Sequence, residues 1–132
     1  ARRAGADVQL QLKDSIPAIW GDRVQLEQVV FNLVLNAIQA VAGTAGERTV
    51  RVETGAAADV VIVTVRDTGP GIAADDPDRV FERFYTTKAH GMGVGLAVSR
   101  SVVEAHGGKL WAAKEPGGGA VFSFHLPAER GD

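Results

Sequence analysis

The chain has 132 residues, 45% hydrophobic and 23% charged, a composition ordinary for one soluble globular domain. Its 14 Lys and Arg residues against 16 Asp and Glu residues leave a net charge of -2, which excludes a strong electrostatic attraction to nucleic acid or to an anionic membrane. Because it has no cysteine, disulfides, zinc-thiolate sites and thiol nucleophiles are excluded as well. No apolar run approaches the ~20 residues that span a bilayer. We therefore expect residues 1–132 to be a single soluble domain of a longer chain.

Two elements with different periodicities open the chain. Apolar and polar residues alternate over Val8–Leu12, the pattern of a half-buried strand. Asp22, followed by Gln25, is a capping box for a helix whose apolar residues recur every three to four positions until Gly43. The sequence therefore predicts a strand over 8–12 and a long helix over 23–42.

The remaining elements lie on either side of one long irregular segment, residues 67–93, which at this length is functional or disordered. Runs of β-branched residues predict hairpins, and helical spacing returns before Gly107 and Gly108 stop it. The expected segments are strands over 49–54 and 60–66 joined by residues 55–59, a helix over 94–106, and strands over 109–114 and 120–126. This order predicts an α+β fold, a two-layer sandwich in which helices cover one face of a mixed sheet.

The long helix has one uncharged polar side, because amide residues recur along it at helical spacing. Asparagine in a helix interior costs roughly 0.6 kcal/mol relative to alanine, so two of them in an apolar segment need compensation. From the helix sequence alone, this polar side could face solvent or bind a ligand. Solvated helix faces usually carry charged residues, which favours a ligand. We call this set the amide stripe; its members are Gln25, Gln28, Asn32, Asn36 and Gln39.

Residues 67–72 read Asp-Thr-Gly-Pro-Gly-Ile and directly follow a predicted strand. A carboxylate at a strand end, such as Asp67, can accept a hydrogen bond from an exocyclic amino group such as that of adenine. Gly69 and Gly71 would let the backbone approach a flat ring closely. An ordinary turn is the alternative for this segment.

Residues 91–96 read Gly-Met-Gly-Val-Gly-Leu and lead into the second predicted helix. Backbone N–H groups at a glycine-rich helix N-terminus are suited to phosphate, although the spacing matches neither the dinucleotide-binding fingerprint nor the P-loop. Upstream, Thr86, Thr87 and Lys88 add two hydroxyls and a cation, whereas Arg79 and Arg83 are as compatible with solvated loop charge as with phosphate. Together the amides, the carboxylate and the glycines indicate one ligand, Mg-ATP.

Four segments resemble the sequence boxes of the sensor histidine kinases, in the family's order. Residues 22–40 resemble the N box, 67–72 the first glycine box, 80–84 (Val-Phe-Glu-Arg-Phe) the F box and 91–96 the second glycine box. The resemblance covers nearly all of the chain. It implies the Bergerat ATP-binding fold of the GHKL superfamily, shared with DNA gyrase, the ninety-kilodalton heat-shock chaperone and MutL.

The resemblance also implies roles for individual residues. Asn36 would be the Mg²⁺ ligand and, with Lys88, a catalytic position, while Asp67 would bind the adenine amino group. Many family members have a basic residue where this chain has Gln39, so a phosphate contact is missing here, and Lys88 could replace it. Residues 86–90 resemble a short lid of the nitrogen-regulation type. The other nucleotide-binding positions implied are Asn32, Gln39, Ala40, Gly69, Gly71, Ile72, Phe84, Thr86, Thr87, Lys88, Gly91, Met92, Gly93, Val94, Gly95 and Leu96.

Asn32 separates the branches of this superfamily. At the position of Asn32, one helical turn before the metal-binding asparagine, the ATPases carry a glutamate that activates water. An amide side chain cannot act as that base. The chain is therefore expected to bind Mg-ATP and transfer its γ-phosphoryl group to a histidine, by positioning and charge neutralisation. The alternatives are a GHKL ATPase, an anti-sigma-type serine kinase, and a degenerate module that only senses ATP.

None of the three histidines lies in a phosphoacceptor-like setting. His106 ends a predicted helix and has a structural explanation, His125 is expected on the sheet face opposite Phe124, and His90 lies in the lid. The resemblance thus implies a dimerisation and phosphoacceptor domain elsewhere in the same kinase and a response regulator downstream. The isolated domain is expected to be monomeric and to contact neither nucleic acid nor membrane directly. It is expected in the cytoplasm, whether or not the parent kinase is membrane-anchored.

Overall fold

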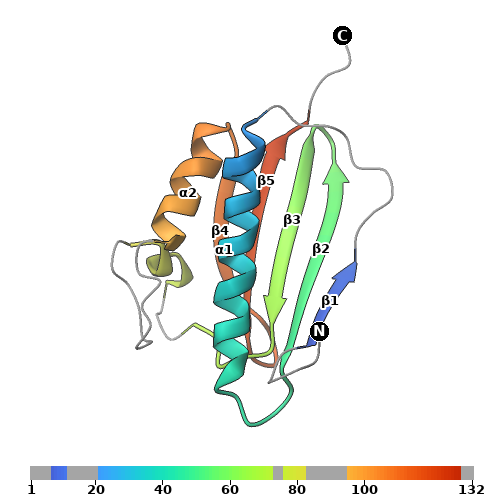
Figure 1. Ribbon diagram of the computed structural model, residues 1–132, viewed down its shortest axis with the longest axis vertical. Helices are drawn as coiled ribbons and strands as arrows, with labels where there is room; N and C mark the ends of the chain where they lie inside the picture. Colours follow the sequence, from blue (N-terminus) through green and yellow to red (C-terminus); the bar gives the residue numbers. More distant parts are fainter. Residues whose placement is uncertain (1–6, 12–20, 73–75, 83–94, 129–132) are drawn as a thin grey trace.

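One five-stranded sheet carries the helices of the described residues on one of its faces. The computed structural model describes residues 7–11, 21–72, 76–82 and 95–128. Their elements are β1 (Asp7–Gln11), α1 (Arg23–Ala42), β2 (Thr49–Ala57), β3 (Val60–Asp67), the 3-10 helix η1 (Pro77–Phe81), α2 (Gly95–Ala105), β4 (Lys109–Lys114) and β5 (Ala120–Pro127). The strand order is β1-β2-β3-β5-β4, with α1, α2 and η1 on the same side (Figure 1). The expected two-layer α+β sandwich is confirmed.

The sheet is mixed because one edge strand runs parallel to its neighbour. β1 pairs with β2 in parallel, whereas β2–β3, β3–β5 and β4–β5 are antiparallel. The hairpin linker expected over 55–59 was wrong in its first three residues, because β2 continues to Ala57. Gly55 pairs with Ile62 and Ala56 with Val61, so the ladder extends until Ala58, whose φ of 52° makes the turn.

The segment 67–93, expected to have no long periodic element, contains the short 3-10 helix η1. Pro77 occupies the first turn of η1, and the Asp76 carboxylate accepts a hydrogen bond from the backbone N–H of Asp78 at 3.0 Å. The helix is short, but it buries Val80 and Phe81 against the core. A local cap, two buried apolar side chains and a hydrogen bond from the Ala112 N–H to the Asp78 carboxylate at 3.2 Å hold this part of the loop.

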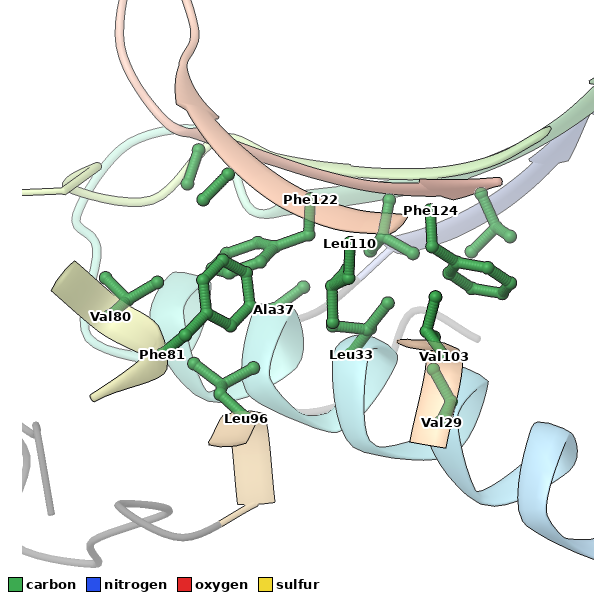
Figure 2. Packing of buried hydrophobic residues seen from close by; sticks show 14 of the residues in the cluster. Val29, Leu33, Ala37, Val80, Phe81, Leu96, Val103, Leu110, Phe122 and Phe124 are labelled. Carbon is green, nitrogen blue, oxygen red and sulfur yellow. The ribbon is translucent and has the colours of Figure 1, made fainter. Parts of the chain in front are cut away.

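The core lies between the sheet and the helices (Figure 2). α1 buries Val29, Leu33, Ala37 and Val41, which follow the spacing that predicted the helix. From the sheet, the side chains facing them include Leu110, Phe122 and Phe124, and the Phe122 ring meets that of Phe81 edge to face at 6.0 Å. Each fully buried large apolar side chain contributes roughly 1.5–3 kcal/mol, so α1 is firmly held with its amide stripe facing to one side.

Candidate functional site

The amide stripe of α1 changes character along the helix. Asp22 caps α1 by accepting a hydrogen bond from the backbone N–H of Gln25 at 3.0 Å, which fixes where the helix begins. Gln25 and Gln28 near this end are exposed, whereas the three later amides, Asn32, Asn36 and Gln39, are half-buried. The solvent-facing interpretation thus fits the start of the stripe but not its C-terminal half, where ligand binding stays a prediction.

Asn32 is held at both ends of its side chain. Its Oδ1 accepts a hydrogen bond from Gln28 Nε2 at 3.2 Å, and its Nδ2 donates one to Ser99 Oγ of α2 at 3.2 Å. Ser99 was not expected to contribute to the site, because a single serine in a helix gives no sequence signal. These bonds tie the stripe to the helix that follows the second glycine box.

Asp67, the last residue of β3, is a buried carboxylate with 3% of its surface exposed. Its Oδ1 accepts hydrogen bonds from the backbone N–H groups of Gly69 at 2.9 Å and Ala120 at 3.3 Å. The Gly69 bond is that of an ordinary Asx turn, but the bond to β5 is not part of any local turn. An ionised carboxylate has about four lone-pair positions, so it can also accept from a ligand amino group.

The first glycine box packs directly against α1. A Cβ atom on Gly69 would lie 2.9 Å from the carbonyl oxygen of Ala40, and one on Gly71, whose φ is +88°, would lie 3.1 Å from that of Gly119. Ile72 packs at the edge of the core cluster. The backbone and the Cβ atom of Ala40 therefore lie against Gly69, which brings the first glycine box close to the C-terminal half of α1.

Gly119 and Ala120 are site-supporting residues that sequence reasoning missed. Residues 117–119 read only as a turn, but a Cβ atom on Gly119, whose φ is +102°, would overlap the carbonyl oxygen of Asp67. Ala120 then supplies one of the N–H groups that hold the Asp67 carboxylate. The three-glycine run signals a turn, and nothing in it shows which glycine lies against another strand.

The N-terminus of α2 is the part of the expected phosphate site that the structure describes. Gly95 begins α2, and Leu96 places its side chain in the core, so it is available to a ligand only through its backbone. Arg79 pairs with Glu82 at 3.6 Å and is exposed, which fits the solvated-charge interpretation. The other expected positions lie outside the described residues: Arg83, Phe84, Thr86, Thr87, Lys88, His90, Gly91, Met92, Gly93 and Val94.

The described residues fit Mg²⁺ bound chiefly through a nucleotide. They contain no group of three or more His, Cys, Asp or Glu side chains able to form an all-protein metal site. Mg²⁺ instead commonly takes one or two protein oxygens together with phosphate oxygens and water. On α1, beside Asn36, the Oε1 atom of Gln39 is a buried oxygen without a hydrogen-bond partner among the described residues. An acceptor oxygen in this position suits a cation or its bound water.

Comparison with known proteins identifies the family. Residues 21–130 match the model of the histidine kinase-, DNA gyrase B- and HSP90-like ATPases. The chain belongs to this family. It is 44% identical over 128 residues to the sensor protein FixL of Bradyrhizobium diazoefficiens, and 42% identical over 123 residues to the sensor histidine kinase ZraS of Escherichia coli. These matches cover 97% and 92% of this chain but only 25% and 26% of the relatives, so the chain spans about a quarter of their length.

A solved structure of this family agrees with the fold. The histidine kinase ThkA, in complex with the response regulator protein TrrA, superposes with a TM-score of 0.77 at 29% identity. The match covers 94% of this chain and 34% of the ThkA chain. Membership of an ATPase family implies ATP binding, which agrees with the ligand indicated by the amide stripe, Asp67 and α2.

Two histidines lie among the described residues of this family member. His106 directly follows α2, and its Nε2 accepts a hydrogen bond from the backbone N–H of Asp22 at 3.0 Å. His125 lies on the sheet face away from the helices, with its ring 5.6 Å from that of Trp111. On the same face, a hydrogen bond to Glu53 raises the pKa of Arg66, which also pairs with Glu115 at 3.0 Å. His106 therefore has a structural contact at the start of α1, while His125 and Arg66 have theirs on the sheet face away from the helices.

Proposed function

We propose that this chain binds Mg-ATP and presents its γ-phosphoryl group to a histidine on the dimerisation domain of a parent sensor kinase. The observation that carries the proposal is the convergence of three elements: the amide stripe of α1, the buried Asp67 at the end of β3, and the N-terminus of α2. The contacts of Gly69 with Ala40 and of Asn32 with Ser99 are what bring them together.

In this proposal each element has a chemical task. Asp67 accepts a hydrogen bond from the adenine amino group, and Asn36 and the adjacent Gln39 oxygen face the metal ion, which neutralises phosphate charge when bound. The N–H groups and dipole of α2 hold phosphate oxygens. Lys88 and the remaining glycine-box residues would complete the phosphate site. Catalysis is then positioning and electrostatic stabilisation, as in phosphoryl transfer generally.

Asn32 favours transfer over hydrolysis. Its side chain is an amide bound to Gln28 and Ser99, so it offers no carboxylate to activate water at this position. A histidine imidazole attacks through a lone pair without first losing a proton. A response regulator would be the downstream partner, as the ThkA–TrrA complex illustrates for that kinase.

The location follows from the ligand. ATP is a cytoplasmic substrate, so we place the domain in the cytoplasm, as a monomer in isolation. α1 is long and apolar enough by length and composition to cross a membrane, yet its stripe of buried side chains packs on the sheet, as in the core helix of a globular domain.

Calorimetric titration with Mg-ATP tests the binding site. We expect Asp67→Asn to weaken binding about tenfold or more, since hydrogen bonds to charged groups are worth roughly 1.5–3 kcal/mol, and Asn36→Asp to abolish metal-coupled binding. Asp59→Asn is the matched control, because Asp59 lies exposed in the turn at the opposite end of β3 and should leave the affinity unchanged. Wild-type affinity in both site variants would refute the assignment.

Labelled ATP then separates the possible activities. Mixed with the phosphoacceptor domain of its parent kinase, the chain should transfer label to histidine and release phosphate slowly. Rapid phosphate release without transfer would instead show an ATPase. Binding with neither reaction would show a degenerate ATP-sensing module.

A further inference from the structure

Ser99 is a polar residue in an apolar stripe. The side chains that α2 buries are Leu96, Ser99 and Val103, and Ser99 is only 1% exposed. A buried hydroxyl costs roughly 1–3 kcal/mol unless it is hydrogen-bonded, a cost that alanine in the same place would not have. Packing against α1 therefore does not explain a serine here.

The partner of Ser99 gives the explanation. Asn32 donates from Nδ2 to Ser99 Oγ at 3.2 Å and accepts at Oδ1 from Gln28 Nε2 at 3.2 Å. An asparagine side chain has one amide oxygen and one NH₂ group, so contacts at both ends fix the plane of the amide. Ser99 supplies the contact that comes from outside α1.

The position of this bond links the two phosphate-facing elements. Asn36 lies one helical turn beyond Asn32 on α1, and Gly95, the first residue of α2, lies one turn before Ser99. The hydrogen bond therefore fixes α1 to α2 one turn from the proposed metal ligand and one turn from the helix N-terminus. Small displacements at such a point change the spacing of groups that must bind the same triphosphate.

We propose that Ser99 is a positioning residue for the triphosphate end of the nucleotide site, acting through Asn32. The inference rests on the proposed Mg-ATP function and extends it to a residue that does not itself touch the ligand. The Ser99 hydroxyl sets how well Mg²⁺ and phosphate are bound together and leaves adenine recognition by Asp67 unchanged.

The test measures ATP affinity of the full chain by calorimetry, once with Mg²⁺ and once with EDTA. Ser99→Ala should weaken Mg-ATP binding about 3- to 10-fold, the range expected for one hydrogen bond, and should reduce the gain in affinity that Mg²⁺ confers. ATP binding in EDTA should change little. Ser101→Ala is the matched control, because Ser101 is exposed on the same helix and should behave as wild type.

A double-mutant cycle tests whether Ser99 affects Mg-ATP binding through Asn32. In an Asn32→Ala background, where the partner is gone, Ser99→Ala should cost no further Mg-ATP affinity. Asn32→Ala alone should reduce the gain in ATP affinity that Mg²⁺ confers, as Ser99→Ala does. Because Asn32 is only half-buried, this variant provides the measurement if Ser99→Ala does not fold. Thermal unfolding without nucleotide records any loss of stability separately.

Three results would overturn the inference. A Ser99→Ala chain that unfolds at lower temperature but keeps the wild-type Mg²⁺ gain would show that the serine serves the core alone. An equal cost in both backgrounds would exclude Asn32 as the route. If the wild-type chain itself gains no ATP affinity from Mg²⁺, the proposed function fails too, and that result is distinct from the first two.

Discussion

The imidazole of His106 accepts a hydrogen bond from the backbone N–H of Asp22, with 3.0 Å between Nε2 and the amide nitrogen. Its other nitrogen, Nδ1, lies 2.8 Å from the carbonyl oxygen of Val102. Only the neutral ring with its hydrogen on Nδ1 can make both bonds, because Nε2 must accept. Asp22 caps the start of α1 and His106 follows the end of α2, so this bond links the two helices at these ends. The bond between Asn32 and Ser99 links the same helices closer to the candidate site.

His106→Ala should therefore destabilise the fold. Loss of the acceptor for Asp22 N–H is expected to lower the free energy of unfolding by about 1 kcal/mol, the net value of a typical hydrogen bond. Urea denaturation followed by circular dichroism measures it, with Ser101→Ala as an exposed control. A midpoint equal to wild type would show that the bond contributes nothing to stability.

Gly21→Ala should also destabilise, and for a related reason. A Cβ atom at this position would lie 2.5 Å from His106 Cδ2 and 2.8 Å from Leu26 Cδ1, so the cost of overpacking is expected to be about 1–2 kcal/mol. In a His106→Ala background the part of that cost that comes from the ring should disappear, while the contact with Leu26 remains. Gly43→Ala is the control, because a Cβ there meets nothing within 4 Å. Equal costs in both backgrounds would mean that the ring is not the obstacle.

The parts of the fold that follow from local sequence were predictable. α1 occupies the predicted residues because Asp22 caps it and the apolar spacing places Val29, Leu33 and Ala37 on one face. Asp67 falls at a strand end as expected. Each of these features depends on residues only a few positions apart, and propensity and periodicity report such relations directly.

Features that depend on distant contacts were not predictable. β2 extends through Gly55 and Ala56 because β3 continues to pair with them, although their small side chains are typical of a turn. Ser99 and Gly119 acquire their roles from Asn32 and Asp67, which lie 67 and 52 positions earlier in the chain. Tertiary pairing decides such cases, and it leaves no periodic signal.

Arg66→Met should have a small, pH-independent effect. The pKa of Arg66 is raised chiefly by its hydrogen bond to Glu53, so the guanidinium stays charged below arginine's ordinary pKa and its contribution is lost only as the pH rises through the raised pKa. Because Arg66 is 39% exposed, we expect at most about 1 kcal/mol, the same at pH 7 and pH 9. Arg23→Met, which removes an exposed pair with Glu27, should cost nothing measurable. A loss of stability that differs between the two pH values would contradict this.

Gly119→Ala should damage the site far more than the same change at its neighbours. Gly117, Gly118 and Gly119 all have positive φ, so alanine costs roughly 1 kcal/mol of backbone strain at each. Only at Gly119 would the new Cβ overlap the Asp67 carbonyl oxygen, whereas the other two face open space. We therefore expect Gly119→Ala to lose at least about 2 kcal/mol more than its neighbours and to weaken ATP binding, because β5 must move away from the Asp67 carboxylate. Parallel denaturation and calorimetry measure this, and equal losses at all three glycines would show that the close approach is unimportant.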